Sequence, residues 1–391
     1  MDKIEELLTR GVGQIYPSKE TLEKVLRSGK KLTLYQGFDP TSPKLHIGHM
    51  VGIRKLKQFQ DLGHRVIFLI GDFTGMIGDP TGKLSSRKQL THDEVIRNAK
   101  LYKQQVGKLL RFEGENPVVI KYNSEWLGKM TALEFLHLSN NLTYSQVVER
   151  DMFQKRIQQK QDVFMGEFLY PFMQAYDSVA MDVDLEVGGE DQMFNMMMGR
   201  KLMRNILRKE KFVITTPLLT DSQGKKIGKT EGNVIAISLP PSDFYAQIMS
   251  LQDDVIIKCM LYLTDIPLLE IEAMEKRIAA GENPMNFKKQ LAYRLTMMLN
   301  SQEGAKKAEN DFANTVQKGE LPKDILKIKV AQNVNIIDFM AVNNLVNSKS
   351  AAKRLVEQGG VEFNSEKVTD SKAKVQKGII KIGKRLFVEV V

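Results

Sequence analysis

Residues 32–70 contain two short apolar segments separated by an amphipathic one, and this pattern limits the possible folds more than any other feature of the sequence. Residues 32–37 and 66–70 have the composition of buried strands. From residue 46 to 62, apolar residues recur every three or four positions, which predicts a helix that ends at Gly63. Strand, helix and strand in this order form a βαβ unit with two parallel strands.

Three more apolar segments of strand length alternate with helical stretches further along the chain. They are residues 117–122, 182–189 and 212–220. This alternation predicts an α/β fold, with a Rossmann-like, doubly wound parallel sheet in a domain of residues 1–240.

The pattern changes after residue 240. Residues 241–320 read as mostly helical and predict a second, helical domain. Residues 321–332 resemble a linker, and residues 333–391 predict a small α+β domain. In that last domain, the sequence SKSAAKRLVEQGG predicts a basic helix, VEFNSEKVTD predicts a hairpin, and GKRLFVEVV predicts a terminal strand.

Composition indicates a soluble globular chain. Of the 391 residues, 42% are hydrophobic and 27% are charged, an ordinary balance for such proteins. No apolar run has the roughly 18–20 residues that span a bilayer. Acidic residues in the first turns (Asp2, Glu5 and Glu6) argue against a transit peptide. The single cysteine, Cys259, excludes a disulfide framework, so we expect a cytoplasmic location.

Positive charge is concentrated at the C-terminal end. The chain carries a formal net charge of +10, and residues 321–391 contain 13 Lys and Arg against 7 Asp and Glu. A basic terminal domain predicts contact with a nucleic acid.

Two histidines, His46 and His49, open the first predicted helix in the sequence KLHIGHM. They could be a metal pair, a helix cap or donors to a phosphate. Zinc in proteins is coordinated by three or four side chains, so a zinc site here would need further ligands from distant parts of the chain. The helix starts directly after a strand, where backbone N–H groups favour phosphate, and Gly48 leaves room for a nucleotide. We therefore interpret both imidazoles as triphosphate donors.

Two glycine-rich loops follow. GDFTGMIGDPTGKLSSR, residues 71–87, lacks the spacing of a Walker-type phosphate loop. DSQGKKIGKTEGN, residues 221–233, carries Lys226 and Lys229. A lysine pair alone is usually a solvated charge run. The surrounding glycines suggest a mobile loop that can close over phosphates.

Six motifs, in order along almost the whole chain, resemble the tyrosyl-tRNA synthetases, which are class I aminoacyl-tRNA synthetases. They are YQGFDPT (35–41), HIGH (46–49), GDPTGK (78–83), YPFMQAYD (170–177), GGEDQ (188–192) and KIGKT (226–230). The last domain resembles an RNA-binding domain named for the fourth protein of the small ribosomal subunit. The resemblance implies activation of L-tyrosine with ATP, accompanied by Mg²⁺, and transfer of tyrosine to tRNA(Tyr).

The resemblance also implies roles for particular residues. The catalytic set that stabilises the leaving pyrophosphate is His46, His49, Lys226, Lys229 and Thr230. The ATP-binding set is Asp39, Thr41, Gly48, Gly189, Asp191 and Lys229. The tyrosine-binding set is Tyr35, Asp79, Tyr170, Gln174, Asp177 and Gln192, with Tyr35 and Asp177 at the phenol hydroxyl. No tightly bound cofactor and no resident metal is expected.

The resemblance further implies a homodimer whose interface includes residues 139–161, no membrane partner, and anticodon recognition by residues 241–320. Other readings stay open. A small-molecule nucleotidylyl transferase would share the histidine signature, and a synthetase-like RNA-binding or splicing protein would share the fold. A tryptophan enzyme is disfavoured by Tyr35 and Asp177.

Overall fold

The computed structural model describes residues 2–81, 90–141, 143–148, 150–227, 234–317, 325–330, 334–346, 348–364, 366–383 and 386–391. The chain divides into two compact units, Met1–Ser301 and Gln302–Val391. The division falls between residues 301 and 302, inside the helical domain that we predicted at 241–320. The predicted boundary at residue 240 does not separate compact units, because the helices that follow belong to the first unit.

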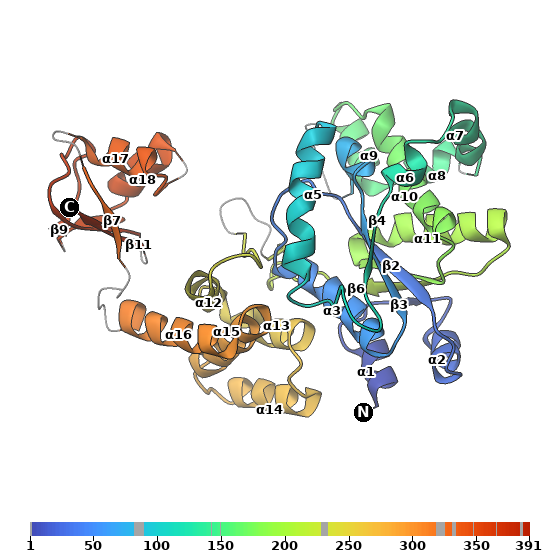
Figure 1. The fold of residues 1–391 in the computed structure, drawn as a ribbon, viewed down its shortest axis with the longest axis horizontal. Coiled ribbons are helices and arrows are strands. Elements are labelled where there is room, and N and C mark those ends of the chain that lie inside the picture. Colours follow the sequence, from blue (N-terminus) through green and yellow to red (C-terminus); the bar gives the residue numbers. More distant parts are fainter. Residues whose placement is uncertain are drawn as a thin grey trace. The chain divides into compact units, whose positions relative to one another are not determined.

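A six-stranded sheet forms the centre of the first unit (Figure 1). Its strands are β1 (Ile15–Tyr16), β2 (Thr33–Phe38), β3 (Arg65–Ile70), β4 (Val119–Tyr122), β5 (Leu185–Gly189) and β6 (Phe212–Thr216), in the order β1-β6-β5-β2-β3-β4. Strands β2 to β6 are all parallel to one another, which confirms the predicted doubly wound sheet. The short edge strand β1, which pairs antiparallel with β6, was not predicted.

The direction of winding reverses between β2 and β5. From β2 the chain continues to β3 and β4 on one side, and then returns to add β5 and β6 on the other. Open α/β sheets bind ligands outside the carboxyl ends of their strands at such a reversal. The fold therefore indicates where a ligand site belongs before any side chain is considered.

Helices cover the sheet in the first unit. They are α1 (Lys3–Thr9), α2 (Lys19–Arg27), α3 (Ile47–Asp61), α4 (Thr74–Ile77), α5 (His92–Val106), α6 (Ser124–Leu127), α7 (Ala132–Ser139), α8 (Tyr144–Val148), α9 (Asp151–Gln158), α10 (Met165–Ala180) and α11 (Met193–Leu202), with a 3₁₀ turn at Glu190–Gln192 and a π-helix at Met203–Leu207. The predicted first helix is α3, and its apolar positions Ile47, Met50, Ile53 and Phe59 are buried. Burial of this face fixes the helix against the sheet.

Four more helices complete the first unit: α12 (Pro241–Met249), α13 (Ile256–Leu263), α14 (Leu268–Ala279) and α15 (Met285–Leu299), with a 3₁₀ turn at Asp253–Val255. The buried Arg10 and the partly buried Arg54 tie them to the sheet region. Arg10 donates to the carbonyl oxygens of Leu261 and Ile266, both at 2.8 Å, and Arg54 donates to that of Thr264. Cations suit the carbonyl-rich C-terminal end of a helix, here α13. These contacts explain why this segment is not a unit of its own.

The second unit contains α16 (Gln302–Phe312), a π-helix (Ala313–Gln317), β7 (Leu326–Ile328), α17 (Ile336–Val342), α18 (Lys349–Glu357), β8 (Val361–Phe363), β9 (Glu366–Lys367), β10 (Gly378–Ile382) and β11 (Leu386–Val390). Its sheet has the order β7-β11-β10-β8-β9. Helices α17 and α18 bury Phe339 and Val356 against strand residues such as Ile380 and Val388. The predicted basic helix, hairpin and terminal strand are thus confirmed as α18, β8–β9 and β11.

Candidate functional site

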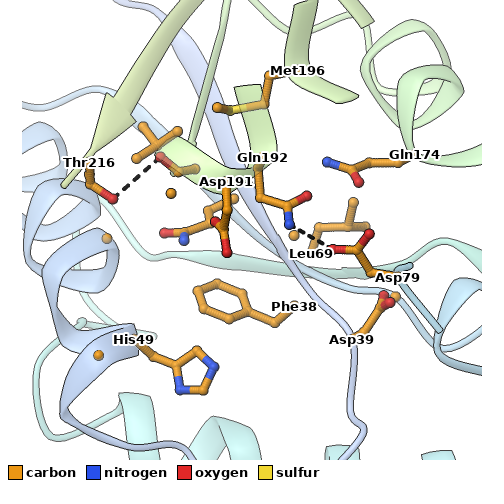
Figure 2. A pocket seen from close by; sticks show the side chains of 18 of the residues that line it. Phe38, Asp39, His49, Leu69, Asp79, Gln174, Asp191, Gln192, Met196 and Thr216 are labelled. Atoms are coloured by element: carbon orange, nitrogen blue, oxygen red, sulfur yellow. Dashed lines mark hydrogen bonds between the residues drawn. The ribbon is translucent and has the colours of Figure 1, made fainter. Parts of the chain in front are cut away.

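A pocket of about 250 Å³ opens at the carboxyl ends of the parallel strands, where the winding reverses. It collects side chains from the ends of β2 and β5, the start of α3, the middle of α10 and the segments after β3 and β6 (Figure 2). The predicted residues that line it are Asp39, Thr41, His46, Gly48, His49, Asp79, Tyr170, Gln174, Asp177, Gly189, Asp191, Gln192 and Lys226. Residues from six separate motifs therefore share one cavity.

The two histidines cap α3 and also line the pocket. His46 Nδ1 accepts from the Gly48 N–H at 3.2 Å, and His49 Nδ1 accepts from the His46 N–H at 3.1 Å. Their rings lie 3.9 Å apart between centroids. Because both Nδ1 atoms accept, each neutral imidazole carries its proton on Nε2, which is a donor. The cap and the phosphate-donor interpretations are therefore compatible.

Gly48 leaves little room for a side chain beside this cap. A Cβ atom at this position would lie 3.0 Å from the His46 ring. That distance is tighter than an ordinary carbon contact of about 3.5–4.0 Å, so a larger residue would push the imidazole away from its cap.

One group of polar side chains surrounds Asp39 at the end of β2. The Tyr170 hydroxyl donates to Asp39 Oδ2 at 2.8 Å, and the Thr74 hydroxyl donates to Asp39 Oδ1 at 2.8 Å. Burial, followed by the nearby charge of Asp39, raises the pKa of Tyr170 well above its usual value. Tyr170 therefore stays a neutral donor at neutral pH. Thr74 was missed in the sequence because a threonine after a strand carries no distinctive signal.

A second group joins Asp79 to α10 and to the segment after β5. Gln192 Nε2 donates to Asp79 Oδ2 at 2.6 Å, as Figure 2 shows. Asn195 Nδ2 donates to Gln174 Oε1 at 2.8 Å and to Gln192 Oε1 at 3.1 Å. Asn195 was also not predicted. It lies three residues after Gln192, and this spacing could have indicated that the two side chains are neighbours on one helical face. The amide network holds a carboxylate and two amide groups around one part of the pocket.

Asp177 lies on α10 and is 3% exposed. Trp126 Nε1 donates to its Oδ1 at 2.8 Å, and Asn123 Nδ2 lies 3.4 Å from its Oδ2. Burial raises the pKa of the Asp177 carboxyl well above its usual value, whereas the hydrogen bonds from Trp126 and Asn123 lower it. Asn123 and Trp126 belong to YNSEWL, directly after a predicted strand, and this position could have identified them.

Lys226 and Asp191, which both line the pocket, form an ion pair with each other. Lys226 Nζ lies 2.6 Å from Asp191 Oδ2. Gly189 lies next to this pair, and a Cβ there would come within 2.6 Å of Asp191 Oδ1. The other two predicted loop residues, Lys229 and Thr230, lie outside the described residues.

Of the predicted site residues that the structure describes, Tyr35 alone is not part of the pocket lining. Its side chain is fully buried and packs with Ile67, Leu69 and Val183. Its hydroxyl is 2.9 Å from Ser178 Oγ. Leu69 lines the pocket, so Tyr35 lies one side chain behind the wall. Its predicted contact with a phenol hydroxyl stays a prediction.

Residues 27–317 match the family described as tRNA synthetases class I (W and Y), and residues 317–388 match the tyrosine–tRNA ligase SYY-like C-terminal domain. The chain belongs to this class I synthetase family. The predicted resemblance is thereby confirmed, and the second match covers the small α+β domain.

Relatives that match over almost their full length support the same family assignment. The chain is 40% identical over 390 residues to the tyrosine–tRNA ligase of Thermotoga maritima, with 98% of this chain and 96% of that protein covered. It is 42% identical over 391 residues to tyrosine–tRNA ligase 2 of Pseudoalteromonas translucida, with 98% and 97% covered.

A solved structure supports the fold. It is a C-terminally truncated mitochondrial tyrosyl-tRNA synthetase from Coccidioides posadasii, with a TM-score of 0.65 and 23% identity over 80% of this chain and 92% of that one.

Proposed function

We propose that this protein is a tyrosine–tRNA ligase. It activates L-tyrosine with ATP to form tyrosyl-adenylate and pyrophosphate, and then transfers tyrosine to the 3′-terminal adenosine of tRNA(Tyr). The observation that carries the proposal is that one pocket contains both the His46–His49 cap of α3 and the α10 row that ends in buried Asp177. The former suits a triphosphate, and the latter suits an amino acid with a polar ring substituent.

Tyrosine occupies the α10 side of the pocket. Its ammonium group binds near Asp79, Tyr170 and Gln174, where acceptor oxygens converge. Its phenol hydroxyl donates to Asp177. Phenylalanine lacks that hydroxyl and would leave the buried carboxylate short of a partner, at a cost of about 1–3 kcal/mol or more. Tyrosyl-tRNA synthetase is the example from which this effect is known.

ATP occupies the α3 side. Gly48 and Gly189 leave space for the nucleotide, and Asp191 binds the ribose after releasing Lys226. A tyrosine carboxylate oxygen attacks the α-phosphorus, a new P–O bond forms, and the bond to the β-phosphate breaks. The Nε2–H groups of His46 and His49, together with Lys226, Lys229 and Thr230, stabilise the negative charge on the leaving pyrophosphate. Positioning and electrostatics supply the catalysis, and no enzyme nucleophile is needed.

Mg²⁺ enters with ATP as part of the substrate. Among the described residues, no group of three or more His, Cys, Asp and Glu side chains could hold a metal ion by itself. The acidic residues of the pocket that can approach the phosphates are Asp39, Asp79 and Asp191, but each one is engaged in a hydrogen bond or ion pair with a neighbour. When bound with ATP, Mg²⁺ would neutralise part of the phosphate charge.

tRNA(Tyr) is the second substrate, and a homodimer is the proposed assembly. The basic C-terminal domain supports the RNA contact through its charge. The dimer proposal is supported by large apolar side chains that are exposed in and beside residues 139–161, namely Leu133, Leu136, Tyr144, Ile157, Phe164 and Met165. None of the described helices is long and apolar enough to cross a membrane. The cytoplasmic location remains a prediction.

ATP–pyrophosphate exchange, measured with each of the twenty amino acids, tests the function. We expect exchange with tyrosine only, followed by charging of a tRNA(Tyr) transcript. Exchange with tryptophan in place of tyrosine, or no exchange with any amino acid, would refute the proposal. The comparisons support this activity over the nucleotidylyl transferase and non-catalytic alternatives.

A further inference from the structure

A buried lysine lies behind the phenol end of the pocket. Lys211, directly before β6, is fully buried. Its Nζ forms an ion pair with Glu186 of β5 and donates to Ser178 Oγ at 2.8 Å. Ser178 Oγ lies 2.9 Å from the Tyr35 hydroxyl and 3.4 Å from Glu186 Oε2. We refer to Lys211, Glu186, Ser178 and Tyr35 as the Lys211 cluster.

The packing around this cluster leaves space for the ammonium group. A Cβ atom on Gly199 of α11 would come within 2.6 Å of Lys211 Nζ and 2.8 Å of Ser178 Oγ. Any larger residue at this position would therefore require the ammonium group or the Ser178 hydroxyl to move. A fully buried charge is costly unless it is paired, so a lysine held in this way needs an explanation beyond core packing.

The cluster is in direct contact with the amino-acid end of the pocket. Glu186 lines the pocket together with Asp177, and Ser178 follows Asp177 on α10. The region thus contains two buried carboxylates and one buried ammonium group. If Lys211 is ionised, its positive charge balances the negative charge of Glu186. Asp177 can then be the one carboxylate of this pair whose charge has no buried ammonium group as its counterion.

The groups that face Asp177 come from several elements. On its own helix α10 lies Tyr170; from β2 and the residues after it come Tyr35 and Asp39. Glu186 comes from β5 and Lys211 from the start of β6, and Asn123 and Trp126 donate hydrogen bonds. After burial, which raises the pKa of Asp177 most, the charge of Glu186 raises it further. Lys211 is the cation that pairs with Glu186. Burial lowers the pKa of Lys211, the charges of Glu186 and Asp177 raise it, and the charge of Arg200 on α11 lowers it.

We propose that Lys211 is a positioning residue for amino-acid recognition: by balancing Glu186 it keeps Asp177 ionised, so that Asp177 can accept the phenol hydrogen bond. The proposal rests on the tyrosine pocket described under the proposed function. Glu186 acts in the opposite direction, because its negative charge favours protonation of Asp177. Protonated Asp177 would have one acceptor oxygen fewer and would bind tyrosine less well.

The test measures kcat/KM for tyrosine in ATP–pyrophosphate exchange from pH 5.5 to 9.5, with three variants. In Lys211→Met, the Asp177 pKa rises, so the ascending limb of the profile moves to higher pH and the tyrosine KM at pH 7 increases at least roughly tenfold. In Glu186→Gln, the limb moves to lower pH. In the double variant, both charges are absent and the profile returns close to that of the wild type.

Lys288→Met is the matched control. Lys288 is a second buried lysine with a single carboxylate partner, Asp253, and it lies on α15. We expect this substitution to lower the thermal unfolding temperature without changing the tyrosine KM or the pH profile. The ATP KM should stay within about twofold of the wild-type value in every variant, because the Lys211 cluster lies on the amino-acid side.

Shifts of opposite sign in the two single variants, with recovery in the double variant, would support the charge-balancing role. A structural role would instead give two losses that add in the double variant, with unshifted profiles, and this result would overturn the inference. If the Lys211→Met variant does not fold, the Glu186→Gln variant still tests the proposal. An ascending limb of its pH profile that does not move from the wild-type position would refute the charge-balancing role. Wild-type exchange is measured first, and failure there would refute the proposed function rather than the role of Lys211.

Discussion

Lys226 Nζ lies 2.6 Å from Asp191 Oδ2, so two residues predicted to contact ATP form an ion pair with each other in this structure. Both side chains are partly exposed, so the pair itself contributes little stability. For both residues to contact ATP as proposed, the ion pair between them has to break, and ATP then takes the place of Lys226 at Asp191 and of Asp191 at Lys226. We propose that the ribose takes Asp191 while Lys226 turns to the phosphates.

Substitution Asp191→Asn tests this exchange of partners. The amide keeps the shape but loses the charge that favours a ribose hydroxyl. We expect the ATP KM to rise roughly tenfold, since a hydrogen bond to a charged group contributes about 1.5–3 kcal/mol. The tyrosine KM should not change. Initial rates of exchange with varied ATP measure the effect, and a change confined to tyrosine would contradict the assignment.

Asp177→Ala should abolish recognition of the phenol hydroxyl. We expect kcat/KM for tyrosine to fall by at least about 100-fold, because a buried charged acceptor is lost. Trp126→Phe removes only the donor that orients Asp177, and a loss of roughly tenfold is expected. Normal tyrosine-dependent exchange by the Asp177→Ala variant would refute the pocket assignment.

His46 has a capping and a proposed catalytic role, and two substitutions separate them. Asn retains a side-chain oxygen that can accept from the Gly48 N–H, whereas Ala does not. His46→Asn should lower kcat roughly 100-fold without loss of stability, since the Nε2–H donor is removed. His46→Ala should lose about 1 kcal/mol of stability in addition. Equal kcat for wild type and His46→Asn would exclude the catalytic role.

His64 predicts a specific pH dependence of stability. It is 4% exposed, its Nδ1 accepts from the Leu32 N–H at 3.1 Å, and burial lowers its pKa to about 4 from 6.5. Below pH 6.5 the unfolded chain binds a proton that the folded chain does not bind. The free energy of unfolding therefore falls as pH decreases from 6.5 to 4, by about 3 kcal/mol at most.

Urea denaturation between pH 4 and 7 measures this dependence. His64→Asn keeps an acceptor oxygen near Leu32 but does not titrate, so the slope of stability against pH should decrease in that variant. An identical slope in both proteins would show that other groups cause the acid sensitivity.

The proposed dimer can be tested through Leu136, which is 60% exposed on α7. Leu136→Asp places a charge in the proposed interface, so light scattering should show a shift from dimer to monomer. Leu269→Asp is the control, because Leu269 is 80% exposed on α14, away from the predicted interface segment in sequence. A dimer that persists in Leu136→Asp would place the interface elsewhere.

Local patterns in the sequence identified the parallel strands and helix α3, and the resemblance to the family identified thirteen of the residues that line the pocket. Strand length, helical periodicity and a glycine at a helix end are set by nearby residues, so they can be read without a structure. The spacing of Tyr170, Gln174 and Asp177 likewise placed them on one face of a helix, and the structure brings all three to the pocket.

Long-range contacts needed the tertiary structure. Strand β1 was missed because its two residues pair only with β6, about 200 residues away in the chain. Helices α12 to α15 belong to the first unit, and among their contacts with it are hydrogen bonds from Arg10 and Arg54 to carbonyl oxygens more than 200 residues further along.

By itself, the sequence determined the five parallel strands, helix α3 and, through its six motifs, the family. The strands and the helix follow from periodicity, which depends on neighbouring residues. The proposed substrate contacts follow from the resemblance to that family. The tertiary structure decided that Tyr35 packs against Leu69 and that Lys211 pairs with Glu186. Each contact joins residues more than twenty positions apart, which sequence periodicity does not bring together. Burial then requires the charged groups to find partners inside the protein.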